Sequence, residues 1–238
     1  VLPAFFYTIC KRNARWVQCV FHIYPSWKIR QGNKVVNFLG EYLQRFSLYL
    51  ARYASGIVII NHDMYETLVA KGFNKNKIKI FNPGIDLQEV LSVLPATKNI
   101  YDAVFLGRLV PSKGIYDIAP IWRRVCDHLP GARLAIVGSG SEMVIRKLTD
   151  IFLENDLQNN IDLLGYLSSQ EIYAMLKCAR AFIFPSHEEG FGIAIVEAMA
   201  CGTPVLAWNL PVYKGLFEGG IISVPQGDFA VFTELLLP

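Results

Sequence analysis

The sequence predicts an α/β protein made of two Rossmann-like domains that face a cleft, with the first domain incomplete. Short β-branched runs alternate with helical patterns along the back half of the chain, which is typical of a parallel sheet covered by helices on both faces. Connections of two to six residues containing Gly, Pro or Ser join these elements. The front half repeats the rhythm with only three strands, which is fewer than a whole domain of this kind needs.

In the back half, the apolar runs predict six strands that alternate with helices, as in a doubly wound sheet. We expect strands near 102–106, 133–137, 161–164, 180–184, 204–207 and 221–224, and helices near 114–129, 141–155, 168–178, 192–201 and 229–236.

In the front half, the pattern predicts strands near 16–22, 56–60 and 77–81 and helices near 34–54 and 62–71. The turn cluster Asn82-Pro83-Gly84-Ile85-Asp86 is the expected hinge. We therefore divide the chain into a partial N-terminal domain (1–86), a linker (87–99) and a C-terminal domain (100–238).

Composition favours a folded cytoplasmic protein. Of the 238 residues, 53% are hydrophobic and 18% are charged, far from the signature of disorder. No apolar run approaches the roughly 18 to 20 residues needed to cross a bilayer, and no secretory signal is evident. The five cysteines form no CxxC pair and no zinc spacing, so we expect buried thiols in a reducing cytosol.

Charge is unevenly distributed along the chain. Residues 1–95 carry 12 Lys/Arg against 5 Asp/Glu, whereas residues 96–238 carry 11 against 15. A basic front half favours an anionic ligand or lipid surface, and no nucleic-acid-binding motif is present. The basic, aromatic segment 27–53 is interpreted in two ways: as a peripheral membrane contact at the inner face of the membrane, or as an ordinary domain helix with an apolar inner face.

The strongest chemical signal begins at Pro185-Ser186-His187-Glu188-Glu189-Gly190-Phe191-Gly192, directly after a predicted strand. This position is the carboxyl end of a parallel strand, where open α/β sheets bind ligands. Gly190 and Gly192 allow close approach of a bulky group, and the helix that starts here offers amides to a phosphate, with Phe191 between the two glycines.

Two carboxylates bracket this helix start. Glu189 lies at its mouth and Glu197 about two turns inside, roughly 12 Å further at 1.5 Å per residue, which is about the length of a nucleotide sugar from hexose to ribose. Each carboxylate is expected to hold hydroxyls at one end of such a ligand. The alternative is that Glu189 only favours the helix start and Glu197 forms a surface pair.

A second loop, Gly107-Arg108-Leu109-Val110-Pro111-Ser112-Lys113-Gly114, follows the first strand of the back half. Arg108 offers a planar fork of donors and Lys113 a point charge, which together suit a diphosphate that gains charge as it leaves. The alternative is two solvated loop cations. Gly138 and Ser139 end the next strand and are interpreted either as a wall of the nucleobase pocket or as a tight turn.

His22 ends the predicted strand 16–22 and could hydrogen-bond a sugar or take up developing charge; a structural histidine is the alternative. His62, His128 and His187 receive no specific role.

With these motifs in order, the chain resembles glycosyltransferase family 4, a group of retaining enzymes with the B-type architecture of two Rossmann domains. The resemblance runs almost continuously from about His22 to Asp228 and rests on the Glu189-x7-Glu197 element, the Gly107–Lys113 loop and the hinge at 82–86. The glycine-rich loop that such enzymes carry near their N-terminus is not found, and their final crossing helix would lie beyond Pro238.

The resemblance implies a nucleotide-diphosphate sugar as donor and a hydroxyl acceptor, which would be a glycan, a small molecule or a lipid-linked sugar. It places Glu189 near the hexose, Glu197 on the ribose, and Arg108 and Lys113 on the diphosphate. His22 would reach the donor from the acceptor-side N-terminal domain, with no cofactor and no metal. Anomeric configuration would be retained without an enzymic nucleophile.

Two other functions stay open. A nicotinamide-dependent oxidoreductase would use the same kind of sheet, but Met143 occupies the position of the third fingerprint glycine. A non-catalytic, membrane-associated binding fragment would use segment 27–53.

Overall fold

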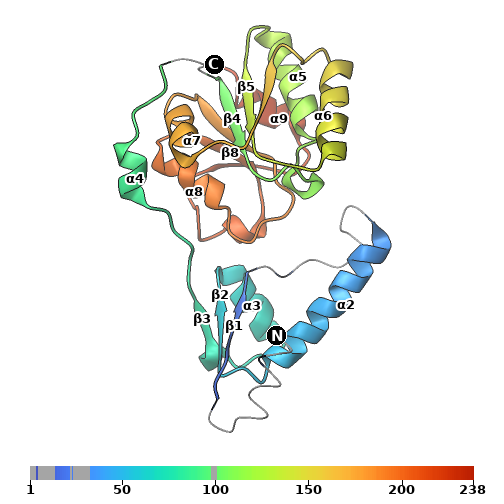
Figure 1. Cartoon of the computed structure of the whole chain (residues 1–238), viewed down its shortest axis with the longest axis vertical. Coiled ribbons are helices and arrows are strands. Elements are labelled where there is room, and N and C mark those ends of the chain that lie inside the picture. Colours follow the sequence, from blue (N-terminus) through green and yellow to red (C-terminus); the bar gives the residue numbers. More distant parts are fainter. Residues whose placement is uncertain (1–3, 5–13, 22, 24–32, 98–100) are drawn as a thin grey trace. The chain divides into compact units, whose positions relative to one another are not determined.

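The computed structural model describes residues 4, 14–21, 23, 33–97 and 101–238. The chain forms two compact units (Figure 1). One consists of residues 1–83 together with 189–191, and the other of residues 84–188 and 192–238. Among the described residues, no helix is both long enough and apolar enough to cross a membrane.

The second unit is built on a six-stranded sheet in which every neighbouring pair of strands is parallel. Its order is β6-β5-β4-β7-β8-β9. The strands are β4 (Ala103–Leu106), β5 (Leu134–Val137), β6 (Ile161–Gly165), β7 (Ala181–Phe184), β8 (Val205–Trp208) and β9 (Ile222–Val224). All residues of β5 and β8 are buried, as expected for parallel strands covered on both faces.

Helices follow these strands in a doubly wound arrangement, and α9 comes after the last strand. They are α5 (Ile118–His128), α6 (Glu142–Glu154), α7 (Ser169–Leu176), α8 (Ile193–Ala200) and α9 (Phe229–Glu234). Figure 1 shows α5 and α6 on one side of the sheet and α7 and α8 on the other. The direction of winding therefore reverses between β4 and β7, and this point is where such folds bind ligands.

The core of the second unit is aromatic as well as aliphatic. Its largest fully buried side chains include Trp122, Trp208, Phe105, Phe182 and Phe232. The rings of Trp208 and Phe232 meet edge to face at 4.7 Å, which fixes α9 against the end of β8. Each buried ring of this kind stabilises the fold by roughly 1.5 to 3 kcal/mol relative to exposure.

The first unit contains a three-stranded parallel sheet in the order β1-β2-β3. The strands are β1 (Val17–Val20), β2 (Gly56–Ile59) and β3 (Ile78–Ile80), and the helices are α2 (Lys34–Ala51) and α3 (His62–Ala70). Ile59 and Leu68 are fully buried between sheet and helix. The α/β class and the parallel sheets predicted from the sequence are confirmed.

The segment expected to be a linker contains a helix. Asp86 caps α4 (Leu87–Ser92) by accepting from the amides of Gln88 at 2.9 Å and Glu89 at 3.2 Å. Val90 is fully buried, and α4 packs against α8. The expectation missed this helix because the turn cluster before it dominates the local sequence pattern, whereas α4 is held by tertiary contacts.

Candidate functional site

The loops that follow β4 and β7 lie next to each other at the carboxyl edge of the second sheet. β4 and β7 are adjacent parallel strands, with Ala103 opposite Ala181. Their carboxyl ends therefore bring residues 107–113 and 185–188 to one edge. Both predicted loops thus meet at the point where the sheet reverses its winding.

Backbone hydrogen bonds join these two loops. The amide of His187 donates to the carbonyl of Ser112 at 2.8 Å. The hydroxyl of Ser186, which is completely buried, donates toward the carbonyls of Ser112 at 3.2 Å and Glu188 at 2.9 Å. The two loops therefore form one packed element, which suits a site that must keep its geometry.

Gly114 permits this close packing. Its backbone is left-handed (φ +68°), and a Cβ placed on it would lie 1.7 Å from the carbonyl oxygen of Pro185. No side chain fits there. The glycine ends the short 3₁₀ turn Pro111–Lys113 and delays the start of α5 to Ile118, four residues later than the sequence pattern predicts.

At position 138, too, the packing of the backbone leaves no room for a side chain. It follows β5 with φ +142°, and a Cβ would lie 1.8 Å from the carbonyl oxygen of Gly107. Leu109 donates its amide to the carbonyl of the exposed residue Ser139 at 2.8 Å. The geometry accounts for Gly138 by backbone packing, and a nucleobase-binding role for Gly138 and Ser139 stays a prediction.

The two predicted cations differ in their environment. Lys113 is half-buried, its Nζ lies 3.3 Å from the carbonyl oxygen of Glu188, and it sits 5.8 Å above the centre of the Phe184 ring. Arg108 is exposed at the same edge. One cation is thus held against the β7 loop and the other projects toward solvent, so an anion between them would have a fixed and an adaptable partner.

Helix α8 begins immediately after the predicted glutamate loop. Its N-cap is Gly192, in a left-handed conformation (φ +95°), which supplies no capping side chain. The first amides of α8 and its dipole favour an anion at this end. Glu189, Gly190 and Phe191 form the loop before it, and this loop is grouped with the first unit.

The predicted helical spacing between the two glutamates is wrong. Residues 189–192 are not helical, so Glu189 and Glu197 are not two helical turns apart on one axis. Only the four steps from Ile193 to Glu197 rise as a helix, about 6 Å at 1.5 Å per residue. The predicted helix, near 192–201, begins close to the observed start of α8 at Ile193, but the 12 Å estimate applied the helical rise to the loop residues 189–192 as well.

Glu197 is half-buried on α8, and the hydroxyl of Tyr173 on α7 lies near its carboxylate. Burial raises the pKa of the Glu197 carboxyl, the Tyr173 hydroxyl opposes the rise, and the nearby charge of Glu89 adds to it. Burial likewise raises the pKa of Cys201, one turn further along, to about 11. Glu197 is therefore a partly desolvated carboxylate, unlike the solvated surface group that the alternative interpretation assumed.

Sequence reasoning missed His187. Its Nε2 lies 3.1 Å from Oδ2 of Asp117, and the same oxygen accepts from Nε1 of Trp208 at 2.9 Å. Gln226 contacts Nδ1 of His187. The available signal was a histidine three residues after a buried strand, within the motif already chosen for Glu189.

His22 lies outside the described residues, so its position is not part of the site geometry. Among the residues that the structure does describe, no three or more His, Cys, Asp or Glu side chains cluster as a metal site would require.

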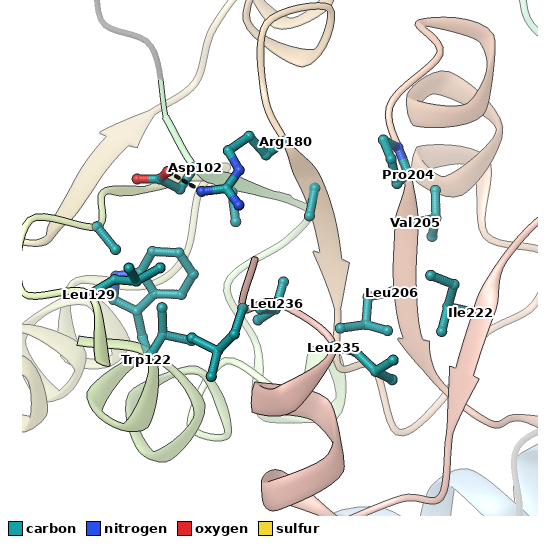
Figure 2. A pocket seen from close by; sticks show the side chains of 15 residues that line it. Asp102, Trp122, Leu129, Arg180, Pro204, Val205, Leu206, Ile222, Leu235 and Leu236 are labelled. Carbon is teal, nitrogen blue, oxygen red and sulfur yellow. Dashed lines mark hydrogen bonds and ion pairs between the residues drawn. The ribbon is translucent and has the colours of Figure 1, made fainter. Parts of the chain in front are cut away.

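A pocket of about 240 Å³ lies at the opposite edge of the second sheet (Figure 2). It is lined by residues at the amino ends of the strands, such as Ala103, Ala181 and Val205, and by leucines after α9. Its charged residues, Asp102 and Arg180, pair with each other at 3.3 Å. Because ligands of open α/β sheets bind at the carboxyl ends of the strands, we do not assign this pocket to the site.

Comparison with known proteins identifies glycosyltransferases as similar in sequence. The family of glycosyl transferases, group 1, matches residues 91–234. An uncharacterized glycosyltransferase of Methanocaldococcus jannaschii is 32% identical over 171 residues, covering 67% of this chain and 41% of that protein. A mannosylfructose-phosphate synthase of Agrobacterium fabrum is 25% identical over 178 residues, covering 68% and 38%. A phosphatidyl-myo-inositol mannosyltransferase of Mycobacterium leprae is 32% identical over 138 residues, covering 56% and 36%.

Among solved structures, Anabaena Alr3699/HepE in complex with UDP and glucose superposes with a TM-score of 0.81 at 18% identity, covering 99% of this chain and 64% of that one. This similarity shows the fold. The chain spans about two fifths of the length of the curated relatives it matches.

Proposed function

This chain belongs to the glycosyl transferases of group 1, and from that premise we propose that it takes part in transfer of a hexose from a nucleotide-diphosphate sugar to a hydroxyl acceptor. The observation that carries the proposal is the packed junction of the β4 and β7 loops, which holds Lys113 against the carbonyl of Glu188, four residues before the N-cap of α8. A cation and an uncapped helix start at one sheet edge suit a diphosphate.

Charge development explains why this arrangement would accelerate transfer. As the bond between the sugar and the diphosphate breaks, the leaving oxygen gains negative charge. Lys113 and Arg108 would stabilise that charge more strongly than they stabilise the bound donor, and only such a difference lowers the barrier. Lys113 is already held by the Glu188 carbonyl, so little reorganisation would accompany the step.

The carboxylates would orient the donor. We assign Glu189 to the hexose hydroxyls and Glu197 to the ribose hydroxyls. A partly buried carboxylate such as Glu197 forms stronger hydrogen bonds than a solvated one, because water competes less. Gly190, Phe191 and Gly192 would bring backbone amides to the phosphates, and His22 would contact the hexose.

The family 4 resemblance supports two finer proposals. Transfer would retain the anomeric configuration, with the acceptor attacking on the face of the leaving group, and no metal ion would take part. The Alr3699/HepE structure is a complex with UDP and glucose, and a uridine or other nucleoside diphosphate sugar is the donor class we propose here.

Nucleotide binding tests the proposal. We expect Lys113→Ala and Glu197→Ala each to weaken the affinity for the best-bound nucleotide sugar about 10- to 150-fold, the value of about 1.5 to 3 kcal/mol for a lost charge-assisted hydrogen bond. His62→Ala, in the first unit, is the control. Unchanged affinity in both site variants, measured by calorimetry across UDP-, GDP- and ADP-sugars, would exclude the proposed site.

We also propose that α2 contacts an anionic membrane surface, which suits a lipid-linked acceptor. Large apolar side chains are exposed at helical spacing along one face of α2. They are Val35, Phe38, Leu39, Tyr42, Leu43, Phe46 and Tyr49. Lys34 and Arg45 flank this face, and Arg45 also pairs with Glu41 at 2.6 Å. An apolar stripe beside cations is the arrangement that binds anionic bilayers.

The Mycobacterium leprae relative carries phosphatidyl-myo-inositol in its name, which is compatible with a lipid surface. Co-sedimentation with phosphatidylserine-containing vesicles tests the contact. We expect binding at low salt that weakens at high salt and is lost in the double variant Leu39→Asp, Phe46→Asp, while Leu153→Asp on α6, also an exposed leucine, leaves binding unchanged. Equal sedimentation of the double variant and the wild type would refute the membrane role.

A further inference from the structure

The structure assigns His187 the role of a positioning residue that holds the diphosphate-binding lysine loop in place. The inference rests on the proposed function, since it concerns the loop that carries Lys113. It is drawn from a chain of side-chain contacts that links β9, β7, α5 and β8 within the second unit.

Asp117 is the centre of this chain. It occupies the N-cap position of α5, where an aspartate usually accepts from the amides of the first turn, yet its side chain makes no cap hydrogen bond. Its Oδ2 instead accepts from Trp208 Nε1 at 2.9 Å and lies 3.1 Å from His187 Nε2. The Asp117 carboxylate therefore joins the start of α5 to Trp208 on β8 and to His187 in the β7 loop, and it does not cap α5.

A single tautomer of the His187 ring can form hydrogen bonds with both Asp117 and Gln226. With the proton on Nε2 it donates to Asp117, and Nδ1 accepts from the side-chain amide of Gln226. Trp208 is completely buried, so its indole provides a fixed anchor for the carboxylate. His187 and Asp117 are each less than one fifth exposed, which limits competition by water.

His187 holds the segment that carries Lys113 at both of its ends. The backbone amide of His187 binds the carbonyl of Ser112, immediately before Lys113, and its ring binds Asp117, four residues after it. Between these two points, Gly114 lies against the backbone of Pro185. One residue of the β7 loop therefore fixes both ends of the segment from which the Lys113 side chain reaches the Glu188 carbonyl.

A double-mutant cycle separates positioning from a general structural effect. The proteins are wild type, Lys113→Ala, His187→Ala, the double variant and His62→Ala, and the measurement is calorimetric affinity for UDP, GDP and ADP. We expect His187→Ala to weaken binding about 5- to 30-fold in the wild-type background. If His187 acts through Lys113, His187→Ala should weaken the affinity less than about 2-fold in the Lys113→Ala background.

Two further variants complete the test. His187→Gln keeps an amide donor near the position of Nε2 and should restore affinity to within about 3-fold of wild type. His62, paired at 3.5 Å with Glu66 on an exposed helix face, is the matched control, and His62→Ala should leave affinity unchanged. If His187→Ala does not fold, as judged by circular dichroism, Asp117→Asn replaces it in the cycle, because it keeps the shape of the side chain.

The outcomes are distinct. Losses that multiply in the double variant, or a His187→Ala protein with wild-type affinity, overturn the positioning role while leaving the proposed function intact. A wild-type protein that binds none of the three nucleotides overturns the proposed function itself, and the positioning role with it.

Discussion

The hydroxyl of Tyr173 lies near the carboxylate of Glu197, across the contact between α7 and α8, and lowers the pKa of that carboxyl. Tyr173 is buried, and its own pKa is raised by burial and by the charge of Glu197. The hydroxyl therefore stays protonated near neutral pH and can donate to the carboxylate. Of the groups that shift the Glu197 pKa, the Tyr173 hydroxyl favours the charged form, while burial and Glu89 oppose it.

This balance predicts a pH dependence of donor binding. If ionised Glu197 holds ribose hydroxyls, affinity should weaken as pH falls toward its raised pKa, because the protonated carboxyl is the poorer acceptor. Tyr173→Phe removes the contact that lowers this pKa, so the pKa rises further and the loss of affinity should begin at higher pH. Calorimetric titration with one nucleotide sugar from about pH 5 to 8 measures both curves.

The nucleotide titrates as well, but its contribution is common to all variants. Glu197→Gln cannot ionise and should lack the part of the pH dependence that separates Tyr173→Phe from wild type. Superimposable pH profiles for wild type and Tyr173→Phe would show that Glu197 does not contact the donor through its charge.

Two glycines with the same backbone conformation should respond differently to substitution. Gly114 and Gly165 both have φ +68°, but a Cβ at Gly114 would overlap the Pro185 carbonyl, whereas one at Gly165 would meet nothing within 4 Å. Gly165→Ala should cost about 1 to 2 kcal/mol, the ordinary cost of a left-handed alanine. Gly114→Ala must also move the β7 loop, so we expect a loss above about 3 kcal/mol.

Urea unfolding followed by tryptophan fluorescence measures the two free energies of unfolding. Because the φ values match, their difference isolates the steric term. Equal losses would mean that the β4 and β7 loops separate easily and that the site is not preorganised.

Most of the second unit could be predicted from the sequence, because its determinants are local. Runs such as 134–137 and 205–208 are apolar throughout and short, which identifies buried parallel strands. Predicted strand limits in this unit differ from the observed ones by at most one residue, as at 180–184 against Ala181–Phe184. The position of the loops that follow β4 and β7 follows directly from that order of elements.

The remaining features depend on contacts between distant residues. The sequence pattern does not show that Gly114 touches Pro185, or that Asp117 binds Trp208 and His187 in place of capping α5. For the same reason α4 was expected to be a linker. Its six residues are too few to form a stable helix alone, and packing against α8 is what orders it.

Cys201 should be nearly inert toward alkylation at neutral pH. Burial raises its pKa to about 11, so roughly one thiol in a thousand is ionised at pH 8. We expect iodoacetamide to modify the exposed Cys19 before Cys201, and the rate at Cys201 to rise about tenfold per pH unit between about pH 7 and 10. Peptide mass spectrometry of timed samples gives both rates, and a rate at Cys201 that levels off below about pH 9 would contradict the raised pKa.

Lys177 should stabilise α4 against local unfolding. Its Nζ donates to the carbonyls of Val90 at 2.7 Å and Val93 at 2.6 Å, at the carboxyl end of the helix, where a cation is favoured. Further along the chain, the backbone amide of Ala96 donates to the carbonyl of Ala174 on α7 at 2.9 Å. Lys177→Met keeps the length of the side chain but removes the donor, which should cost the segment about 1 to 3 kcal/mol of local stability.

Hydrogen exchange measures that local stability directly. In Lys177→Met, the amides of residues 88–94 and 96 should exchange about 5- to 150-fold faster, while those of β5 stay protected, because α4 can open without unfolding the sheet. Lys214→Met, at an exposed lysine of the same unit, should leave both regions unchanged. If residues 88–96 kept wild-type protection in Lys177→Met, the burial of Val90 alone would account for the docking of α4, and the ammonium contacts would contribute nothing measurable.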